Sequence, residues 1–106
     1  MRHKILISAR AWSHLDELYS YLRGKAGPEI ADSFLGGVQQ SILGLADFPF
    51  LGKRRSSGRI PGLYTISHKS RTVIAYTVDE RAMTVIVLGV YYGGRDYETD
   101  LDISND

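Results

Sequence analysis

The spacing of hydrophobic residues predicts two helices in the first half of the chain. Apolar side chains recur every three or four positions over residues 11–22 and again over residues 30–45, which is the spacing of one apolar helix face. Ser8 can cap the first helix through its hydroxyl. Pro28 suits the start of the second, because the first turn of a helix does not need the missing N–H. The short link between the two helices predicts an antiparallel hairpin.

The remaining apolar runs have the length and composition of β-strands, and they cover residues 3–8, 63–68, 72–78 and 84–92. The last three runs are joined by short connections, which predicts a three-stranded antiparallel meander. The run 84–92 is apolar on both faces, as in a central strand. We therefore expect an α+β fold of order β-α-α-β-β-β, with the helices packed on one face of the sheet.

A single domain is expected over residues 1–97, followed by an acidic C-terminal tail at residues 98–106. The length of 106 residues suits one hydrophobic core. The tail carries few apolar residues among its acids, a composition that favours fraying. The chain has no cysteine, which excludes disulfides and thiolate sites. Its first residues contain only a short apolar run, so no signal peptide or membrane span is expected, and a cytoplasmic location follows.

Basic residues are concentrated in one interval of the chain. No acidic residue lies between Asp47 and Asp79, whereas that interval contains Lys53, Arg54, Arg55, Arg59, His68, Lys69 and Arg71. A surface of one charge sign attracts anionic partners, either nucleic acid or an acidic protein segment. The alternative is a solvated loop that keeps the protein soluble. An aromatic strand of the RNA-recognition type is missing, so we expect no sequence-specific nucleic-acid binding.

The histidines and glycines do not form a recognisable catalytic or metal motif. His3, His14 and His68 are scattered without metal-ligand spacing, so we expect no metal site and no cofactor. His14 is most simply part of a solvated helix face. The pair Gly36–Gly37 lies inside the second helical pattern, where glycine is unfavourable. We expect close approach of the first helix there, through Trp12 or Tyr19.

The stretch VYYGGRDYE at residues 90–98 follows the most apolar run of the chain. It has two interpretations. Arg95 and the tyrosines can form a catalytic cluster at the strand end, because arginine suits the stabilisation of phosphate charge. Alternatively, the stretch is a turn that ends the sheet and presents a binding edge for a partner.

Three segments together carry a resemblance to a known family: ISARAWSHLDELYSYL, GPEIADSFLGGVQQSILGLADFPFLGKRR and PGLYTISHKSRTVIAYTVDERAMTVIVLGVYYGGRD. Their order and spacing are similar to those of the ParE/RelE superfamily of bacterial toxins, the toxic halves of type II toxin–antitoxin pairs. Within this superfamily, RelE-like members are ribosome-dependent endoribonucleases. ParE-like members share the fold without that catalytic set and poison DNA gyrase.

The resemblance favours the ParE-like branch. RelE-like enzymes carry alternating lysines where this chain has Thr65 and Ser67, and an arginine where it has Val73. A further arginine of those enzymes aligns near Gly93, and a shift of two positions is needed to bring Arg95 into register. We therefore expect no enzymatic activity and no catalytic residue, with a RelE-like endonuclease as the alternative.

The resemblance also implies the partners. These are a ParD-like antitoxin, which neutralises the toxin in a complex, and DNA gyrase as the target. The expected partner-binding residues come from the basic interval and from the stretch 90–98, and they are Arg54, Arg55, Arg59, Arg71, Tyr91, Tyr92 and Arg95.

Overall fold

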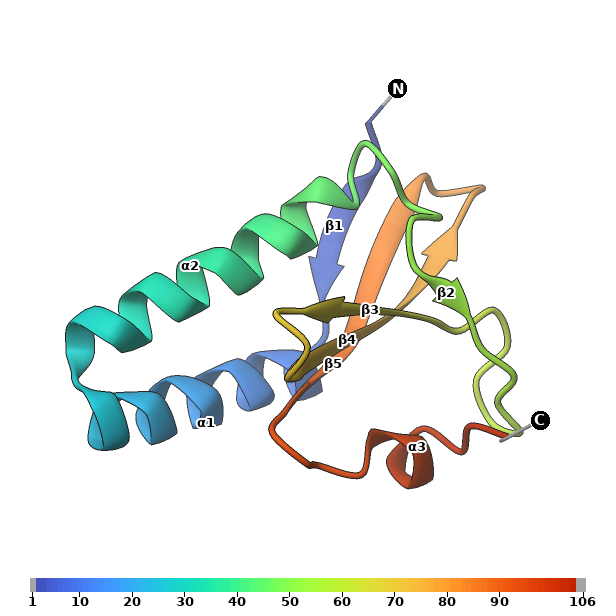
Figure 1. Ribbon diagram of the computed structural model, residues 1–106. Helices are drawn as coiled ribbons and strands as arrows, with labels where there is room; N and C mark the ends of the chain where they lie inside the picture. The colour runs from blue at the N-terminus through green and yellow to red at the C-terminus, as the bar shows by residue number, and fades with distance from the viewer. Residues whose placement is uncertain (1, 105–106) are drawn as a thin grey trace.

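The computed structural model describes residues 2–104 of the chain as a sheet with a helical hairpin against one face (Figure 1). The elements, in order, are β1 (Lys4–Ile7), α1 (Ala9–Ala26), α2 (Pro28–Gly44), β2 (Lys53–Arg54), β3 (Tyr64–His68), β4 (Thr72–Asp79), β5 (Thr84–Tyr92) and α3 (Tyr97–Asp100). The α+β fold, the hairpin and the meander of β3, β4 and β5 are confirmed.

The five strands form one sheet in the order β1-β5-β4-β3-β2. Strand β1 runs parallel to β5, with Lys4 opposite Thr84, whereas the other pairs are antiparallel. The central position of β5 agrees with its apolar composition. Strand β2 pairs with the start of β3, so the segment expected to be a loop after α2 contributes a short edge strand.

A β-bulge interrupts the pairing of β4 with β5. Ala75 lies opposite Gly89 while Tyr76 lies opposite Val87, so Leu88 has no partner in β4. Such an extra residue bends the strand and changes which side chains face each layer. The free carbonyl of Leu88 accepts a hydrogen bond from the Ser8 hydroxyl at 3.3 Å. The same hydroxyl accepts from the Ala11 N–H at 3.1 Å, which confirms Ser8 as the cap of α1.

The main core lies between the hairpin and the sheet. Its fully buried members come from α1, α2, β4 and β5, and they are Ala11, Leu18, Leu22, Ala31, Val38, Ile42, Ile74, Val87 and Val90. Ile5 and Ile7 of β1 pack against this cluster, while Leu6 between them is exposed, as strand alternation requires. The apolar helix faces read from the sequence are therefore the faces that build this core.

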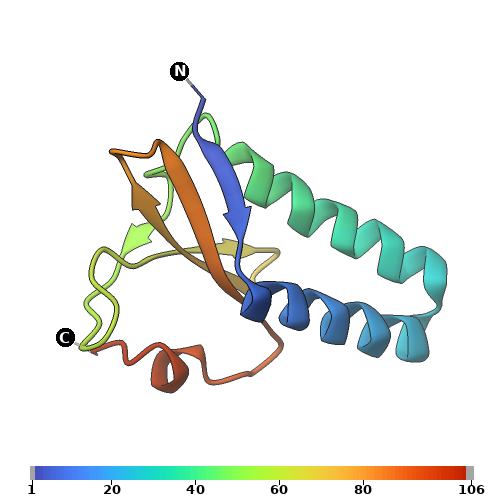
Figure 2. The ribbon, with the colours of Figure 1, turned by 180° about the vertical axis from the view of Figure 1, so that it is seen from behind.

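The second face of the sheet is partly covered by the C-terminal segment. Leu101 is 2% exposed and packs in a cluster with Leu63, Ala75 and Tyr91. Ile103 forms a β-bridge with Ser57, in the loop after β2, and both views show the segment running beside that loop (Figures 1 and 2). Up to residue 104, the structure therefore shows a packed segment where the sequence predicted a fraying tail. Leu101 is buried against the sheet and Ile103 is half-buried beside the loop after β2, which the acidic composition of the segment conceals. Residues 105–106 lie outside the described part.

The glycine pair in α2 is explained by β3, not by α1 as the sequence suggested. The ring of His68 lies so close that a Cβ on Gly37 would be 2.9 Å from its Cε1 atom. The same ring contacts the Ser41 hydroxyl through Nδ1 at 3.0 Å and the edge of Phe34. A Cβ on Gly36 would meet no atom within 4 Å. Only one glycine of the pair is needed for packing.

We expect the two glycines to respond in opposite directions to alanine. Gly36→Ala should raise the free energy of unfolding by about 1 kcal/mol, because alanine favours a helix interior over glycine. Gly37→Ala should lower it by about 1 kcal/mol, since the displaced His68 ring outweighs that gain. Urea denaturation of both variants measures the difference, and equal stabilisation by the two substitutions would contradict this account of the pair.

Candidate functional site

A cleft of about 410 Å³ lies where β5 ends against α1. We call it the Arg71–Arg95 cleft. Its wall from α1 consists of His14, Glu17, Leu18 and Tyr21, and its wall from the sheet and the following turn consists of Arg71, Val90, Tyr92, Gly93, Gly94 and Arg95. The sequence analysis selected Arg71, Tyr92 and Arg95, and the structure brings these three together. It missed the wall from α1, although positions 14, 17, 18 and 21 share a helix face.

Two tight turns place the arginines at this end of the sheet. Thr72 at the start of β4 lies opposite Tyr92 at the end of β5, so the residues just outside these strands are neighbours. Lys69 and Ser70 adopt left-handed conformations with φ of 51° and 58°, which close the β3–β4 turn just before Arg71. The Gly93 N–H donates to the Arg71 carbonyl at 2.8 Å, and Gly93 has a φ of 67°. This glycine turns the chain so that Arg95 returns toward α1.

The two arginines have different environments. Arg71 lies with its guanidinium 5.9 Å from the centre of the Tyr92 ring and forms no ion pair with any residue of 2–104. Arg95 pairs with Glu17 of α1 at 3.2 Å, with both side chains more than half exposed. Such an exposed pair is weak, so an anionic ligand can displace Glu17. The sequence predicted that Arg95 binds a partner; its contact with α1 depends on tertiary structure.

His14 is not the solvated residue that the sequence suggested. Its Nδ1 atom accepts a hydrogen bond from the Val90 N–H at 3.0 Å, and its ring contacts Tyr91 edge-on at 5.0 Å. Because Nδ1 accepts, the neutral imidazole carries its proton on Nε2. Burial, followed by the nearby charges of Arg10 and Arg95, lowers the pKa of His14. The imidazole therefore stays neutral at a pH where an exposed histidine begins to protonate.

We expect His14 to make the fold sensitive to mild acid. Its pKa is lowered from 6.5 in the folded protein, so the unfolded chain binds this proton first and stability falls as the pH drops from 6.5 through the folded value. Urea denaturation at pH 8 and pH 5 tests this. The loss of stability between pH 8 and pH 5 should be smaller for His14→Gln, because the glutamine side-chain oxygen can accept from the Val90 N–H without titrating. Equal losses in both proteins would contradict the expectation.

Tyr91 is almost completely buried, in contrast to the edge tyrosine that the sequence predicted. It is 5% exposed, and its hydroxyl donates to the Asp100 carboxylate at 2.5 Å. A Cβ on Gly89 would lie 2.8 Å from the Tyr91 ring, so this glycine makes room for the side chain. Burial and the bond to Asp100 raise the pKa of Tyr91. The hydroxyl is therefore a hydrogen-bond donor throughout the physiological pH range.

Asp100 connects three parts of the chain to the C-terminal segment. Its carboxylate accepts from Tyr91 and from the Arg10 guanidinium, and its backbone carbonyl accepts from the Arg59 guanidinium. The bond from Tyr91, followed by that from Arg10, lowers the pKa of Asp100. The Ser57 hydroxyl donates to the Leu101 carbonyl at 2.6 Å. Together these contacts hold the segment on the sheet.

Two further arginines predicted to bind a partner are engaged by the same segment. Arg59 reaches the Asp100 carbonyl. Arg55, whose side chain is only 18% exposed, lies 3.9 Å from Glu98 and 5.9 Å from the centre of the Tyr97 ring. Arg54 is exposed on β2 and lies over the Tyr64 ring at 5.8 Å. Arg59 stays exposed despite its hydrogen bond. Of the seven predicted residues, Tyr91 is buried and Arg55 is largely covered, and Arg71, Tyr92 and Arg95 line the Arg71–Arg95 cleft.

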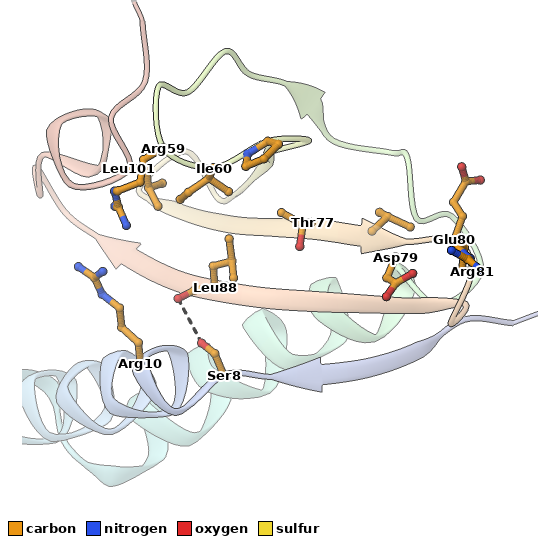
Figure 3. A pocket seen from close by; sticks show the side chains of 12 residues that line it. Ser8, Arg10, Arg59, Ile60, Thr77, Asp79, Glu80, Arg81, Leu88 and Leu101 are labelled. Carbon is orange, nitrogen blue, oxygen red and sulfur yellow. Dashed lines mark hydrogen bonds between the residues drawn. The ribbon is translucent and has the colours of Figure 1, made fainter.

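A wider hollow of about 770 Å³ lies on the second face of the sheet. Figure 3 shows Leu88 and Thr77 on its floor, with Arg10 and Arg59 at one end and Asp79 at the other. Both of these arginines bind Asp100, so this hollow offers mixed rather than one-sign charge. Across residues 2–104 there is no group of three side chains able to hold a metal ion, and no helix of that region is long and apolar enough to cross a bilayer.

Three solved structures show the same fold at low sequence identity. A chain of the chromosomal ParDE system from P. aeruginosa matches with a TM-score of 0.73 and 18% identity, over 87% of this chain and 97% of that one. A chain of the complex RelBE2 from Mycobacterium tuberculosis matches with a TM-score of 0.64 and 18% identity, over 90% of this chain and 95% of that one. A mutant of the E. coli toxin RelE in the free state matches with a TM-score of 0.63 and 16% identity, over 96% of this chain and 95% of that one.

These matches overturn the expectation that the protein is not an enzyme. RelE toxins adopt this fold with TM-scores of 0.63 and 0.59, and the resemblance described above assigns endoribonuclease activity to RelE-like members. Neither the fold nor the missing lysines at Thr65 and Ser67 therefore excludes catalysis. The Arg71–Arg95 cleft adds two guanidinium groups and a neutral imidazole at one place, an arrangement that the sequence analysis did not anticipate.

The family itself is identified by a match over most of the chain. No curated protein matches this sequence. A family model described as "ParE toxin of type II toxin-antitoxin system, parDE" matches residues 5–97, the span from β1 to the first residue of α3. The chain therefore belongs to the ParE toxin family and is the toxin of a type II toxin–antitoxin system, with an antitoxin as its partner.

Proposed function

We propose that this toxin acts in the ParE manner, by binding DNA gyrase in the cytoplasm so that cleaved DNA accumulates and replication stops. The observation that carries the proposal is the chemistry of β3. It presents Thr65 and Ser67 where the resemblance requires the lysines of RelE-like enzymes, and Thr65 is 6% exposed. β3 therefore lacks the lysine cations with which those enzymes stabilise phosphate charge, which favours the ParE manner of action.

A supercoiling assay with purified gyrase tests this proposal. The wild-type toxin should inhibit supercoiling and trap cleaved DNA, which becomes visible as linear plasmid after protein digestion. Ribosomes programmed with mRNA provide the parallel assay on the same preparation, and the mRNA should remain intact. Unaffected supercoiling at a toxin concentration that arrests bacterial growth would refute gyrase as the target.

A second function, ribosome-dependent mRNA cleavage, is favoured by the Arg71–Arg95 cleft. Arg71 and Arg95 can contact a phosphate, and Tyr21 and Tyr92, whose ring centres are 5.9 Å apart, offer faces for a base. The neutral His14 in the same cleft has a protonated Nε2 atom. Under this alternative, wild-type toxin cuts mRNA on the ribosome and Arg71→Ala with Arg95→Ala abolishes cleavage while leaving the fold intact.

For the antitoxin we propose a ParD-like protein with an acidic segment. Arg71 forms no ion pair within residues 2–104, and the pair of Arg95 with Glu17 is exposed. Carboxylates of the antitoxin can bind both guanidinium groups, with Tyr92 beside them. The antitoxin would then bind at the Arg71–Arg95 cleft, and this binding should weaken as salt is added.

A further inference from the structure

The loop after α2 carries an exposed apolar surface that no part of the fold accounts for. Phe48 is 66% exposed, Phe50 48% and Leu51 68%. Scattered apolar residues are normal on a protein surface, whereas a cluster of large ones marks an interaction site. Lys53 and Arg54 follow immediately in β2 and are exposed as well. These five residues, Phe48, Phe50, Leu51, Lys53 and Arg54, are called the 48–54 surface.

The backbone of this surface is fixed by the sheet. The Gly52 N–H donates to the Tyr76 hydroxyl at 2.8 Å, and Tyr76 is fully buried. Tyr64 stacks on Tyr76 with ring centres 5.5 Å apart, and Phe50 lies against Tyr64 at 5.7 Å. The Leu51 N–H closes a turn onto the Phe48 carbonyl at 3.1 Å. A surface that is already ordered loses little conformational entropy when a partner binds.

The charges beside the apolar residues that have no ion-pair partner within residues 2–104 are positive. Lys53 and Arg54 form no ion pair with any residue of 2–104. The nearest acid in the sequence, Asp47, is matched by Arg2 at 3.2 Å. An occupant of this surface must therefore supply carboxylates next to apolar side chains. A nucleic acid could stack its bases on the phenylalanines but would leave Leu51 without an apolar partner, and a bilayer would be held by too few residues. A protein surface satisfies both requirements.

The 48–54 surface is separate from the Arg71–Arg95 cleft. The Ala46 carbonyl, at the base of the loop, accepts from the His3 N–H, and β1 then begins opposite Thr84, the first residue of β5. The cleft forms around Tyr92, the last residue of β5. The two sites thus lie toward opposite ends of the central strand, as the loop after α2 and the end of β5 do in Figure 1. A ligand in the cleft leaves this surface free.

We propose that the 48–54 surface is the docking site for the toxin's target protein, where an apolar hollow flanked by carboxylates receives Phe48 and Leu51. Under the proposed function, on which this inference rests, that target is DNA gyrase. Phe48 and Leu51 act as the apolar anchors, while Lys53 and Arg54 pair with the flanking carboxylates and steer the encounter. The antitoxin would then bind at the Arg71–Arg95 cleft, and the target would bind at the 48–54 surface.

Two double variants and two matched controls test the inference with purified gyrase. Phe48→Ser with Leu51→Ser should weaken gyrase binding at least tenfold, because buried anchors dominate an interface. Lys53→Glu with Arg54→Glu should weaken it at least tenfold at low salt and less at high salt. Ile30→Ser, which changes an equally exposed residue at the start of α2, and Arg81→Glu in the β4–β5 turn should bind as wild type does. Thermal melting verifies that each variant is folded.

The outcomes separate the inference from the proposed function. If wild-type toxin fails to bind gyrase, the proposed function fails and this docking assignment fails with it. If the wild type binds and both double variants bind equally well, the docking assignment alone is wrong. Concentration-dependent dimerisation of the wild type that Phe48→Ser with Leu51→Ser abolishes would assign the surface to a second copy instead. Loss of binding to anionic phospholipid vesicles in that variant would assign it to a membrane, and either result overturns the proposal.

Discussion

Replacing Gly52 by alanine is expected to lower the free energy of unfolding by about 3 kcal/mol, because the site has no room for a methyl group. A Cβ at this position would be 2.7 Å from the Tyr76 hydroxyl and 2.8 Å from both the Thr65 carbonyl and the Ile66 side chain. The carbonyl belongs to the β3 backbone, so the conflict cannot be relieved by one side-chain rotation. The hydrogen bond from the Gly52 N–H to Tyr76 is strained by the same displacement.

Chemical denaturation measures this effect, with Gly44→Ala as the control. Gly44 is the last residue of α2, and a Cβ there would meet no atom within 4 Å. The control should be unchanged or slightly more stable. Gly52→Ala should also reduce whatever binding depends on the 48–54 surface, because the loop and the Tyr76 anchor move together. A Gly52→Ala protein as stable as Gly44→Ala would show that the loop packs differently.

Replacing Asp100 by alanine is expected to release the C-terminal segment and to lower the free energy of unfolding by about 2 kcal/mol. The carboxylate accepts from the Tyr91 hydroxyl at 2.5 Å and from Arg10. Its removal leaves a buried tyrosine hydroxyl without its acceptor. Limited proteolysis should then cut after residue 96 faster than in the wild type, in parallel with the loss measured in urea.

The acid dependence of the same site provides an independent check. The pKa of Asp100 is lowered from 3.8 in the folded protein, so its contribution is complete above the unfolded value and is lost as the pH falls through the folded one. The stability gap between the wild type and Asp100→Asn should stay constant near neutral pH and close below pH 3.8. Asp32→Ala, an exposed change on α2, should show no such gap. A gap that persists at the lowest pH would rule out the carboxylate as its source.

Local patterns in the sequence were sufficient for the helices and the meander. The cap at Ser8, the helix start at Pro28 and the apolar spacing of α1 and α2 all act within a few residues, and each is found in the structure. The short connections between β3, β4 and β5 indicated their antiparallel pairing in the same way. These features depend on backbone preferences and on burial of one face, and both are visible in a linear sequence.

The features that escaped prediction depend on residues far apart in the chain. His14 faces Val90, Arg95 faces Glu17, and Tyr91 is buried by a segment that its own composition marks as solvated. A two-residue strand such as β2 exists only because β3 lies beside it. The accessible part of the candidate site, with Arg71, Tyr92 and Arg95, was predicted because all three flank one strand pair. Its other wall came from α1, which no local pattern connects to β5.

The parallel pairing of β1 with β5 has a consequence for how the toxin is made. Ile7 at the end of β1 lies opposite Val87, so the first strand has no sheet partner until β5 has been synthesised. Long-range strand pairing of this kind is slow and comes late in folding. The Arg71–Arg95 cleft needs residues up to 95, so a nascent or truncated chain lacks it. The order of synthesis therefore makes this cleft one of the last features of the fold to appear, after both helices of the hairpin and the first four strands have been made.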